Sequence, residues 1–160
     1  MRESLSSLRL AAASDEQTRA LGARLGKALL AERRDSGIVV GLTGELGAGK
    51  TTLVAGVLAA LGHDGPVRSP TYALVEPYRC GDRDVYHCDL YRLEDPDQLE
   101  DLGYRDFVRP GAIVLVEWPE KGGERLGSLD LMVEVSYDGL GRAFVFRALT
   151  PRGRQLMASF

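Results

Sequence analysis

The sequence predicts an α/β fold, a single three-layer domain with a mostly parallel central sheet and an antiparallel hairpin part. Two continuous apolar runs, 38–43 and 112–117, lack any alternation of polar residues, which is typical of strands covered on both faces. A glycine-rich loop and a segment of helical periodicity follow the first run. The length of 160 residues fits one domain spanning residues 1–160.

The elements of the first half follow from spacing and end signals. Ser14 and Gln17 resemble a capping box, and the leucines that follow recur at helical spacing, which predicts an amphipathic helix over 15–33. After the first apolar strand and its glycine-rich loop, apolar residues return to helical spacing over 50–61. Gly62 is placed to end that second helix.

The second half reads as two hairpins around a short helix and a buried strand. Alternating runs interrupted by turn residues predict strands, and Pro in a first turn with Gly after the last residue is typical of a helix. The predicted elements are strands 72–79 and 84–89, a helix over 95–102, the apolar strand 112–117, and strands 131–137 and 142–149.

Composition and charge narrow the class of protein. Hydrophobic residues make up 44% and charged residues 27% of the chain, which predicts a packed core rather than disorder. The net charge of −3 gives no support for direct binding to a nucleic-acid backbone. No apolar run is long enough to span a bilayer, so we expect no membrane partner. Cys80 and Cys88 would not face each other across the first hairpin, so we expect no disulfide between them. Free thiols predict a reducing, cytoplasmic location.

Residues 44–51, Gly-Glu-Leu-Gly-Ala-Gly-Lys-Thr, fit the phosphate-binding pattern G-x-x-x-x-G-K-[ST]. Glycines let the backbone turn tightly and direct its N–H groups at an anion, and the start of the next helix adds further donors. Lys50 can reach the β- and γ-phosphates, and the Thr51 hydroxyl can hold Mg²⁺. The sequence therefore predicts ATP and Mg²⁺ as ligands, bound by Glu45, Leu46, Gly47, Ala48, Gly49, Lys50, Thr51 and Thr52.

Carboxylates at the ends of two further predicted strands are candidates to complete this site. Glu117 ends the second apolar strand, at the sheet edge where ligands gather in α/β proteins, which predicts a metal ligand in the place usually taken by Asp. Asp89 also ends a strand, and Ser69 and Thr71 offer hydroxyls on a loop stiffened by a proline. A simple turn and solvated strand ends are the alternative interpretations of these residues.

Four motifs together resemble one known family. The phosphate loop, Ser-Pro-Thr-Tyr at 69–72, His-x-Asp-x-Tyr-Arg-Leu at 87–93 and Val-Glu-Trp-Pro-Glu at 116–120 strongly resemble the bacterial tRNA threonylcarbamoyladenosine biosynthesis ATPase family, TsaE. The resemblance covers nearly the whole chain, in order and at similar spacing. It implies a P-loop NTPase-like domain that binds ATP and hydrolyses it slowly. It also implies two partners, a kinase-like threonylcarbamoyl transferase subunit and its inactive paralogue, which modify adenosine 37 of ANN-decoding tRNAs, so that tRNA is met only indirectly.

The resemblance also assigns roles to individual positions. It implies a catalytic set of Lys50, Asp89 and Glu117, with Thr51 and Glu117 as metal ligands, a switch loop carrying Ser69 and Thr71, and contacts of Thr18 with the base and of Arg142 with the nucleotide. Asp89 would either orient the attacking water or couple the switch loop to it.

A small-molecule P-loop kinase is the alternative function. It would need an acceptor pocket and usually a lid that carries arginines over the nucleotide. Arg105 and Arg109 are the only arginines between Leu93 and Gly111, which is weak support for such a lid. A nucleotide-gated binding module that scarcely hydrolyses ATP alone is a third interpretation, and it overlaps with the role implied by the family.

Overall fold

A computed structural model describes residues 6–70 and 72–160, and their strands form one mixed sheet in the order β1-β7-β6-β2-β5-β4-β3. The four central strands, β6, β2, β5 and β4, run parallel, and antiparallel pairing attaches β7 and β1 at one side and β3 at the other. The strands are β1 Ser7–Ala12, β2 Ile38–Gly44, β3 Val75–Cys80, β4 Arg83–Asp89, β5 Ile113–Glu117, β6 Leu131–Asp138 and β7 Gly141–Ala148. This is the predicted parallel centre with antiparallel additions.

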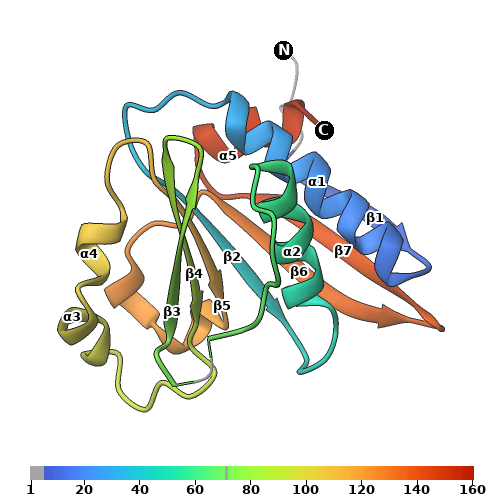
Figure 1. Ribbon diagram of the computed structural model, residues 1–160. Coiled ribbons are helices and arrows are strands. Elements are labelled where there is room, and N and C mark those ends of the chain that lie inside the picture. Colours follow the sequence, from blue (N-terminus) through green and yellow to red (C-terminus); the bar gives the residue numbers. More distant parts are fainter. Residues whose placement is uncertain (1–5, 71) are drawn as a thin grey trace.

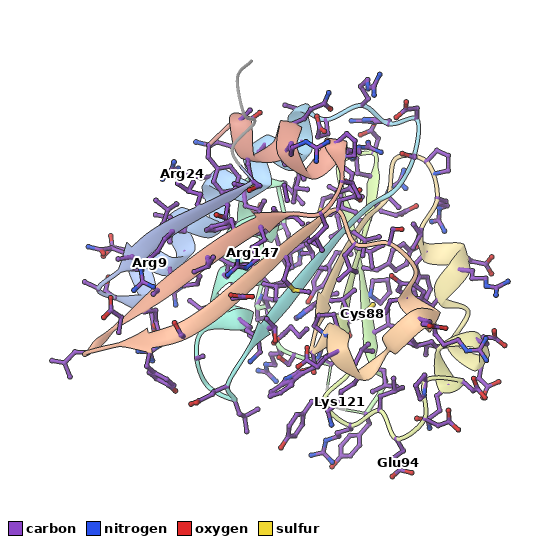
Figure 2. All side chains as sticks on the ribbon, turned by 180° about the vertical axis from the view of Figure 1, so that it is seen from behind. Arg9, Arg24, Cys88, Glu94, Lys121 and Arg147 are labelled. Atoms are coloured by element: carbon purple, nitrogen blue, oxygen red, sulfur yellow. The ribbon has the colours of Figure 1, made fainter. Side chains whose placement is uncertain are left out.

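Helices cover the two faces of the sheet unequally (Figure 1). α1 Asp15–Ala31, α2 Lys50–Ala60 and α5 Pro151–Ala158 pack on one face, where they share a large apolar core with the sheet. The other face is covered over β2, β5 and β4 by α3 Gln98–Leu102, α4 Tyr104–Phe107 and the 3₁₀ helices η1 Pro119–Lys121 and η2 Gly123–Leu126. Figure 2 shows Arg9 of β1 and Arg147 of β7 on the part of that face which no helix covers.

The helix α1 begins and ends on side-chain hydrogen bonds. Ser14 Oγ accepts from Gln17 N at 3.2 Å, and Gln17 Oε1 accepts from Ala13 N at 2.7 Å, so the predicted N-terminal cap is present. At the other end the buried guanidinium of Arg83 donates to Leu29 O at 3.2 Å. Arg83 thereby satisfies a helix-terminal carbonyl, and α1 ends at Ala31, two residues before the predicted boundary.

Two glycines set the close packing of α1 on α2. A Cβ at Gly22 would lie 2.2 Å from Leu53 O, and one at Gly56 would lie 2.2 Å from Arg19 O, so any side chain would force the helices apart. Gly26 meets α2 one turn further on, at Val57, so the two helices run in the same direction. This packing ties the phosphate-loop helix to a long, capped neighbour.

Two terminal elements, β1 and α5, were not predicted from the sequence. β1 is a half-buried edge strand whose pairing partner, β7, lies more than 120 residues away in the sequence, so local periodicity gave only a weak signal. The helix α5 has local signals: Thr150 Oγ1 accepts from Gly153 N at 3.1 Å, and Pro151 occupies its first turn. Its short length of eight residues hid the periodicity.

Two predicted elements begin three residues later than expected. The predicted helix 95–102 is regular only from Gln98, and Gly103, with φ 79°, ends it before the unpredicted α4 begins. Strand 72–79 begins at Val75, because Leu74 has a positive φ of 62° that breaks the extended chain. The hairpin of β6 and β7 agrees with the prediction to within one residue at each end.

The two cysteines lie as the sequence predicts. Cys80 pairs with Arg83 and Cys88 with Val75 across the hairpin, so the two thiols are out of register, and both are free and buried. Within the described residues, no helix combines the length and apolar character needed to cross a bilayer.

Candidate functional site

The register of the parallel strands brings the ends of β2, β4 and β5 to one level. Asp89 pairs with Glu117, and Glu117 pairs with Leu42 just before the phosphate loop. Side chains alternate along a strand, so His87 and Asp89 of β4 share one face of the sheet, the face covered by α2. Residues separated by up to 75 positions in the sequence therefore meet at the carboxyl edge of the sheet.

The loop between β2 and α2 has a backbone that only glycine adopts readily. Gly44 has φ 145°, and a Cβ there would lie 2.3 Å from Val135 O. Gly49 has φ 114° and immediately precedes α2, whose first N–H groups have no partners within the helix. The loop and the helix start together present backbone donors to the same space, which is the arrangement that binds phosphate.

The Lys50 side chain is hydrogen-bonded to the backbone of the phosphate loop. Its ammonium group donates to Gly44 O at 2.6 Å and to Glu45 O at 2.8 Å, and the side chain is 4% exposed. Nζ also lies 4.5 Å from the ring centroid of Trp118. Burial lowers the pKa of Lys50, while the negative charges of Glu117, Asp89 and Glu120 act in the opposite direction.

Glu117 is the centre of a buried hydrogen-bond network, and its side chain is only 3% exposed. The Thr51 hydroxyl donates to its carboxylate at 3.2 Å and 3.3 Å, and the Ser69 hydroxyl donates at 3.3 Å. Thr51 and Ser69 also contact each other at 2.6 Å, and His87 Nε2 lies 2.5 Å from Glu117 Oε2. The metal ligands predicted from the sequence therefore stand in direct contact.

Asp89 stands beside this network and is half-buried. Its Oδ1 accepts a hydrogen bond from Tyr91 N at 3.0 Å. Burial raises the pKa of Asp89, and the charge of Glu117 raises it further, whereas the hydrogen bonds from Tyr91 and Ser69 and the nearby His87 lower it. The carboxyl is thus less acidic than a free aspartate.

A cleft of about 240 Å³ opens onto these groups. It is lined by Leu46, Gly47, Gly49, Lys50, Thr51, Thr52, Ser69, Asp89, Glu117 and Trp118. A larger cavity of about 800 Å³ lies on the opposite face of the sheet beneath α3, α4 and η2, far from the phosphate loop. The smaller cleft is the one that gathers the residues predicted from the sequence.

Four of the predicted nucleotide-binding residues lie outside the cleft lining. The backbone carbonyl of Glu45 accepts from Lys50, and the buried Ala48 contributes a carbonyl that accepts from Arg142 Nε at 2.9 Å. Arg142 therefore contacts the phosphate loop itself. Thr18 is buried on α1, one turn before the glycine contact with α2. The switch-loop residue Thr71 lies outside the described residues.

Two residues gain importance from the structure. His87 is the first residue of the motif at 87–93, and the family resemblance assigns it no role. Its position two residues before Asp89 places both side chains on the same face of the strand. Trp118, which the sequence analysis names only within the 116–120 motif, lines the cleft and faces the Lys50 ammonium group. Its backbone is left-handed, with φ 58°, as the chain turns from β5 into η1.

The side chains present fit ATP and Mg²⁺ by their chemistry. A carboxylate and a hydroxyl in contact are hard oxygen donors of the kind that Mg²⁺ prefers. The loop amides and the lysine provide the positive complement to phosphate groups. Buried strand, glycine loop, lysine and strand-end acid are together the features of a P-loop NTPase-like protein.

Comparison with known proteins gives the particular family. Residues 12–143 match the family model described as "Threonylcarbamoyl adenosine biosynthesis protein TsaE", and the chain belongs to the TsaE family. The "tRNA threonylcarbamoyladenosine biosynthesis protein TsaE" of Haemophilus influenzae is 42% identical over 139 residues, covering 87% of this chain and 88% of that protein. Its counterpart in Mycobacterium tuberculosis is 41% identical over 128 residues, covering 75% and 73%.

A solved structure agrees with this assignment. The crystal structure of YdiB from Bacillus subtilis matches with a TM-score of 0.74 and 29% sequence identity. The match covers 95% of this chain and 92% of that one. The α/β architecture predicted from the sequence is therefore confirmed.

Proposed function

We propose that this chain binds ATP with Mg²⁺, hydrolyses it slowly, and is required for threonylcarbamoylation of adenosine 37 in ANN-decoding tRNAs. The observation that carries the proposal is the contact of Thr51 with Glu117 at 3.2 Å, beside the phosphate loop and Lys50, in a chain that belongs to the TsaE family. Membership of the TsaE family supports a role in tRNA threonylcarbamoyladenosine biosynthesis. The side chains of the cleft support ATP and Mg²⁺ as the ligands.

The proposed roles follow from where each group lies. Thr51 and Glu117 would hold Mg²⁺, which would neutralise charge on the β- and γ-phosphates. Lys50 would exchange its two carbonyl partners for phosphate oxygens, and the loop amides would hold the phosphates in line. Asp89 would accept a hydrogen bond from the attacking water or couple Ser69 of the switch loop to it.

Slow turnover by the chain alone agrees with the surroundings of the cleft. Among the described residues, no arginine lines the cleft to stabilise the charge of the transition state. Lack of such a group typically leaves hydrolysis about 10³–10⁵-fold slower. We propose that the kinase-like transferase subunit and its inactive paralogue supply what is missing, and that tRNA is reached only through them.

The kinase alternative receives no support from the segment that would form a lid. Leu93, Leu99 and Tyr104 of residues 93–111 are buried in a separate apolar cluster on the face of the sheet opposite α2. Arg109 is paired with Asp84 at 2.5 Å, and Arg105 lies 3.7 Å from Glu100. Neither arginine is placed over the phosphate loop.

The test is ATP hydrolysis by the purified chain with Mg²⁺, alone and then with the two transferase partners and tRNA. We expect slow basal turnover, stimulation by the partners, and loss of about 10²–10³-fold in Lys50→Ala. Lys27→Ala, an exposed lysine on α1, is the matched control and should be neutral. Turnover that is indifferent to the partners would contradict the proposal and would direct attention to small-molecule phosphate acceptors.

A further inference from the structure

The contact between His87 and Glu117 is the shortest in the site and the most deeply buried. Nε2 of His87 lies 2.5 Å from Oε2 of Glu117, and the two side chains are 0% and 3% exposed. A buried carboxylate is costly unless hydrogen-bond donors satisfy it. Thr51 and Ser69 make longer contacts, at 3.2–3.3 Å, so His87 is the donor that fixes one carboxylate oxygen most firmly.

The surroundings of the imidazole favour a proton on Nε2 over one on Nδ1 alone. Nδ1 of His87 is buried and has no hydrogen-bond partner among the described residues. If only Nδ1 carried a proton, its N–H group would have no acceptor among the described residues. The lone pair of Nε2 would then face the lone pairs of Glu117 Oε2 and repel them. A proton on Nε2 instead donates to the carboxylate and leaves only a bare acceptor at Nδ1.

We propose that His87 is a positioning residue that orients Glu117 for the divalent cation. The inference rests on the proposed function, since it assumes that Thr51 and Glu117 bind the metal. The Nε2–H group holds Oε2, so the carboxylate cannot turn about its last bond, and among the described residues Oε1 has only the 3.3 Å contact from Thr51. His87 touches neither nucleotide nor metal in this scheme, and it acts through Glu117 alone.

The first experiment measures metal affinity rather than turnover. Mn²⁺, which has an EPR signal, is titrated into the chain with a non-hydrolysable ATP analogue, for the wild type, His87→Leu and His87→Gln. We expect Mn²⁺ affinity to fall about 10–100-fold in His87→Leu, the usual cost of losing a hydrogen-bond partner of a metal ligand. His87→Gln keeps an N–H group and should recover most of the loss.

A matched control comes from the other histidine. The chain has two histidines, and His63 packs against Tyr78 away from the cleft, with its own Nε2 buried and without a partner among the described residues. His63→Leu removes the same ring from a partly exposed position and should leave Mn²⁺ affinity unchanged. Analogue binding without metal should be alike in all four proteins.

The outcomes separate the two proposals. Wild-type protein that binds no Mn²⁺ with the analogue would overturn the proposed function, and this inference with it. Tight Mn²⁺ binding by wild type and His87→Leu alike would overturn only the role of His87. A His87→Gln variant as weak as His87→Leu would show that an N–H donor at this place does not matter, and would likewise overturn the role of His87 alone.

The second experiment needs no substitution at His87 and so holds even if those variants fail to fold. Long-range ¹H–¹⁵N NMR of the wild-type imidazoles reports which nitrogen carries the proton, and His63→Leu assigns the two ring signals. We expect the His87 proton on Nε2. A ring protonated on Nδ1 alone would leave Nε2 unable to donate to Glu117 and would overturn the proposal.

Discussion

Arg142 Nε donates a 2.9 Å hydrogen bond to the backbone carbonyl of Ala48, which joins strand β7 to the middle of the phosphate loop. The guanidinium also lies 4.2 Å from the ring centroid of Tyr137, and this contact holds it over the loop. A strand distant in sequence thus fixes the loop shape before a nucleotide arrives.

Replacing Arg142 should weaken nucleotide binding. We expect Arg142→Ala to lower ATP affinity about tenfold, since one hydrogen bond from a charged donor is lost and the loop must be ordered on binding. Arg147→Ala, on the other face of the same strand in an exposed pair with Glu134, should change affinity little. Calorimetric titration measures the ATP affinity of both variants. Equal affinities would contradict the role of Arg142 in ordering the phosphate loop.

The raised pKa of Asp89 predicts a pH-dependent gain in stability for Asp89→Asn. A carboxyl whose folded pKa lies above its unfolded value stabilises the fold at low pH, and that stability is lost as pH rises through the folded pKa. Near neutral pH we therefore expect Asp89→Asn to be more stable by roughly 0.5–2 kcal/mol, at the expense of hydrolysis. Denaturant unfolding across a pH series measures the difference in the free energy of unfolding between the variant and the wild type. This difference should disappear as the pH is lowered.

Asp84→Asn provides a control of opposite sign. Hydrogen bonds from Arg109 and Arg79 lower the pKa of Asp84, so its ionised form stabilises the folded state above the unfolded pKa. The variant should be less stable than wild type near neutral pH, and the difference should vanish as pH falls through the folded pKa. The same sign of effect in both variants would contradict the electrostatic argument.

Gly56→Ala should destabilise the protein although alanine favours helices. The gain in helix propensity is about 1 kcal/mol, but the new Cβ would lie 2.2 Å from the Arg19 carbonyl oxygen on α1. Backbone atoms cannot yield as a flexible side chain can, so we expect a net loss of about 1–3 kcal/mol in the free energy of unfolding. The exposed Ala59→Gly on the same helix should cost about 1 kcal/mol, from propensity alone. A more stable Gly56→Ala protein would refute the close approach of the helices.

Cys88 should be unreactive in the native protein. Burial raises the pKa of its thiol to about 12, and the neighbouring Asp89 adds to the effect, so almost no thiolate forms at moderately alkaline pH. In a Cys80→Ser background, a chromogenic disulfide reagent should fail to label Cys88 until denaturant is added. Prompt labelling of the folded chain would indicate that β4 opens readily.

The sequence was sufficient for the fold class and the phosphate loop, because both depend on local patterns. Buried strand, glycines, Lys50 and Thr51 are contiguous, and the apolar run before Glu117 marks a central strand without reference to its neighbours. The boundaries of β6 and β7 were nearly right for the same reason, since turn residues act over a few positions.

What could not be predicted depends on contacts between distant segments. The bond of His87 to Glu117 requires the register of β4 on β5, and the bond of Arg142 to Ala48 requires β7 to be placed beside β6. Arg83 has the sequence context of a turn residue, and only the fold brings its guanidinium to the end of α1. The family resemblance supplied a role for Arg142 near the nucleotide, but not the loop contact that places it there.

The alternation of side chains along β4 has a consequence for how such genes can change in length. His87 and Asp89 stand two positions apart on a strand that begins at Arg83, after a turn of only two residues. A codon gained or lost within that strand before His87 would rotate both side chains to the opposite face and exchange them for their apolar neighbours. Insertions and deletions should therefore be tolerated in the exposed turns that flank this strand, and an insertion scan of the gene should show β4 as a short interval in which none survives.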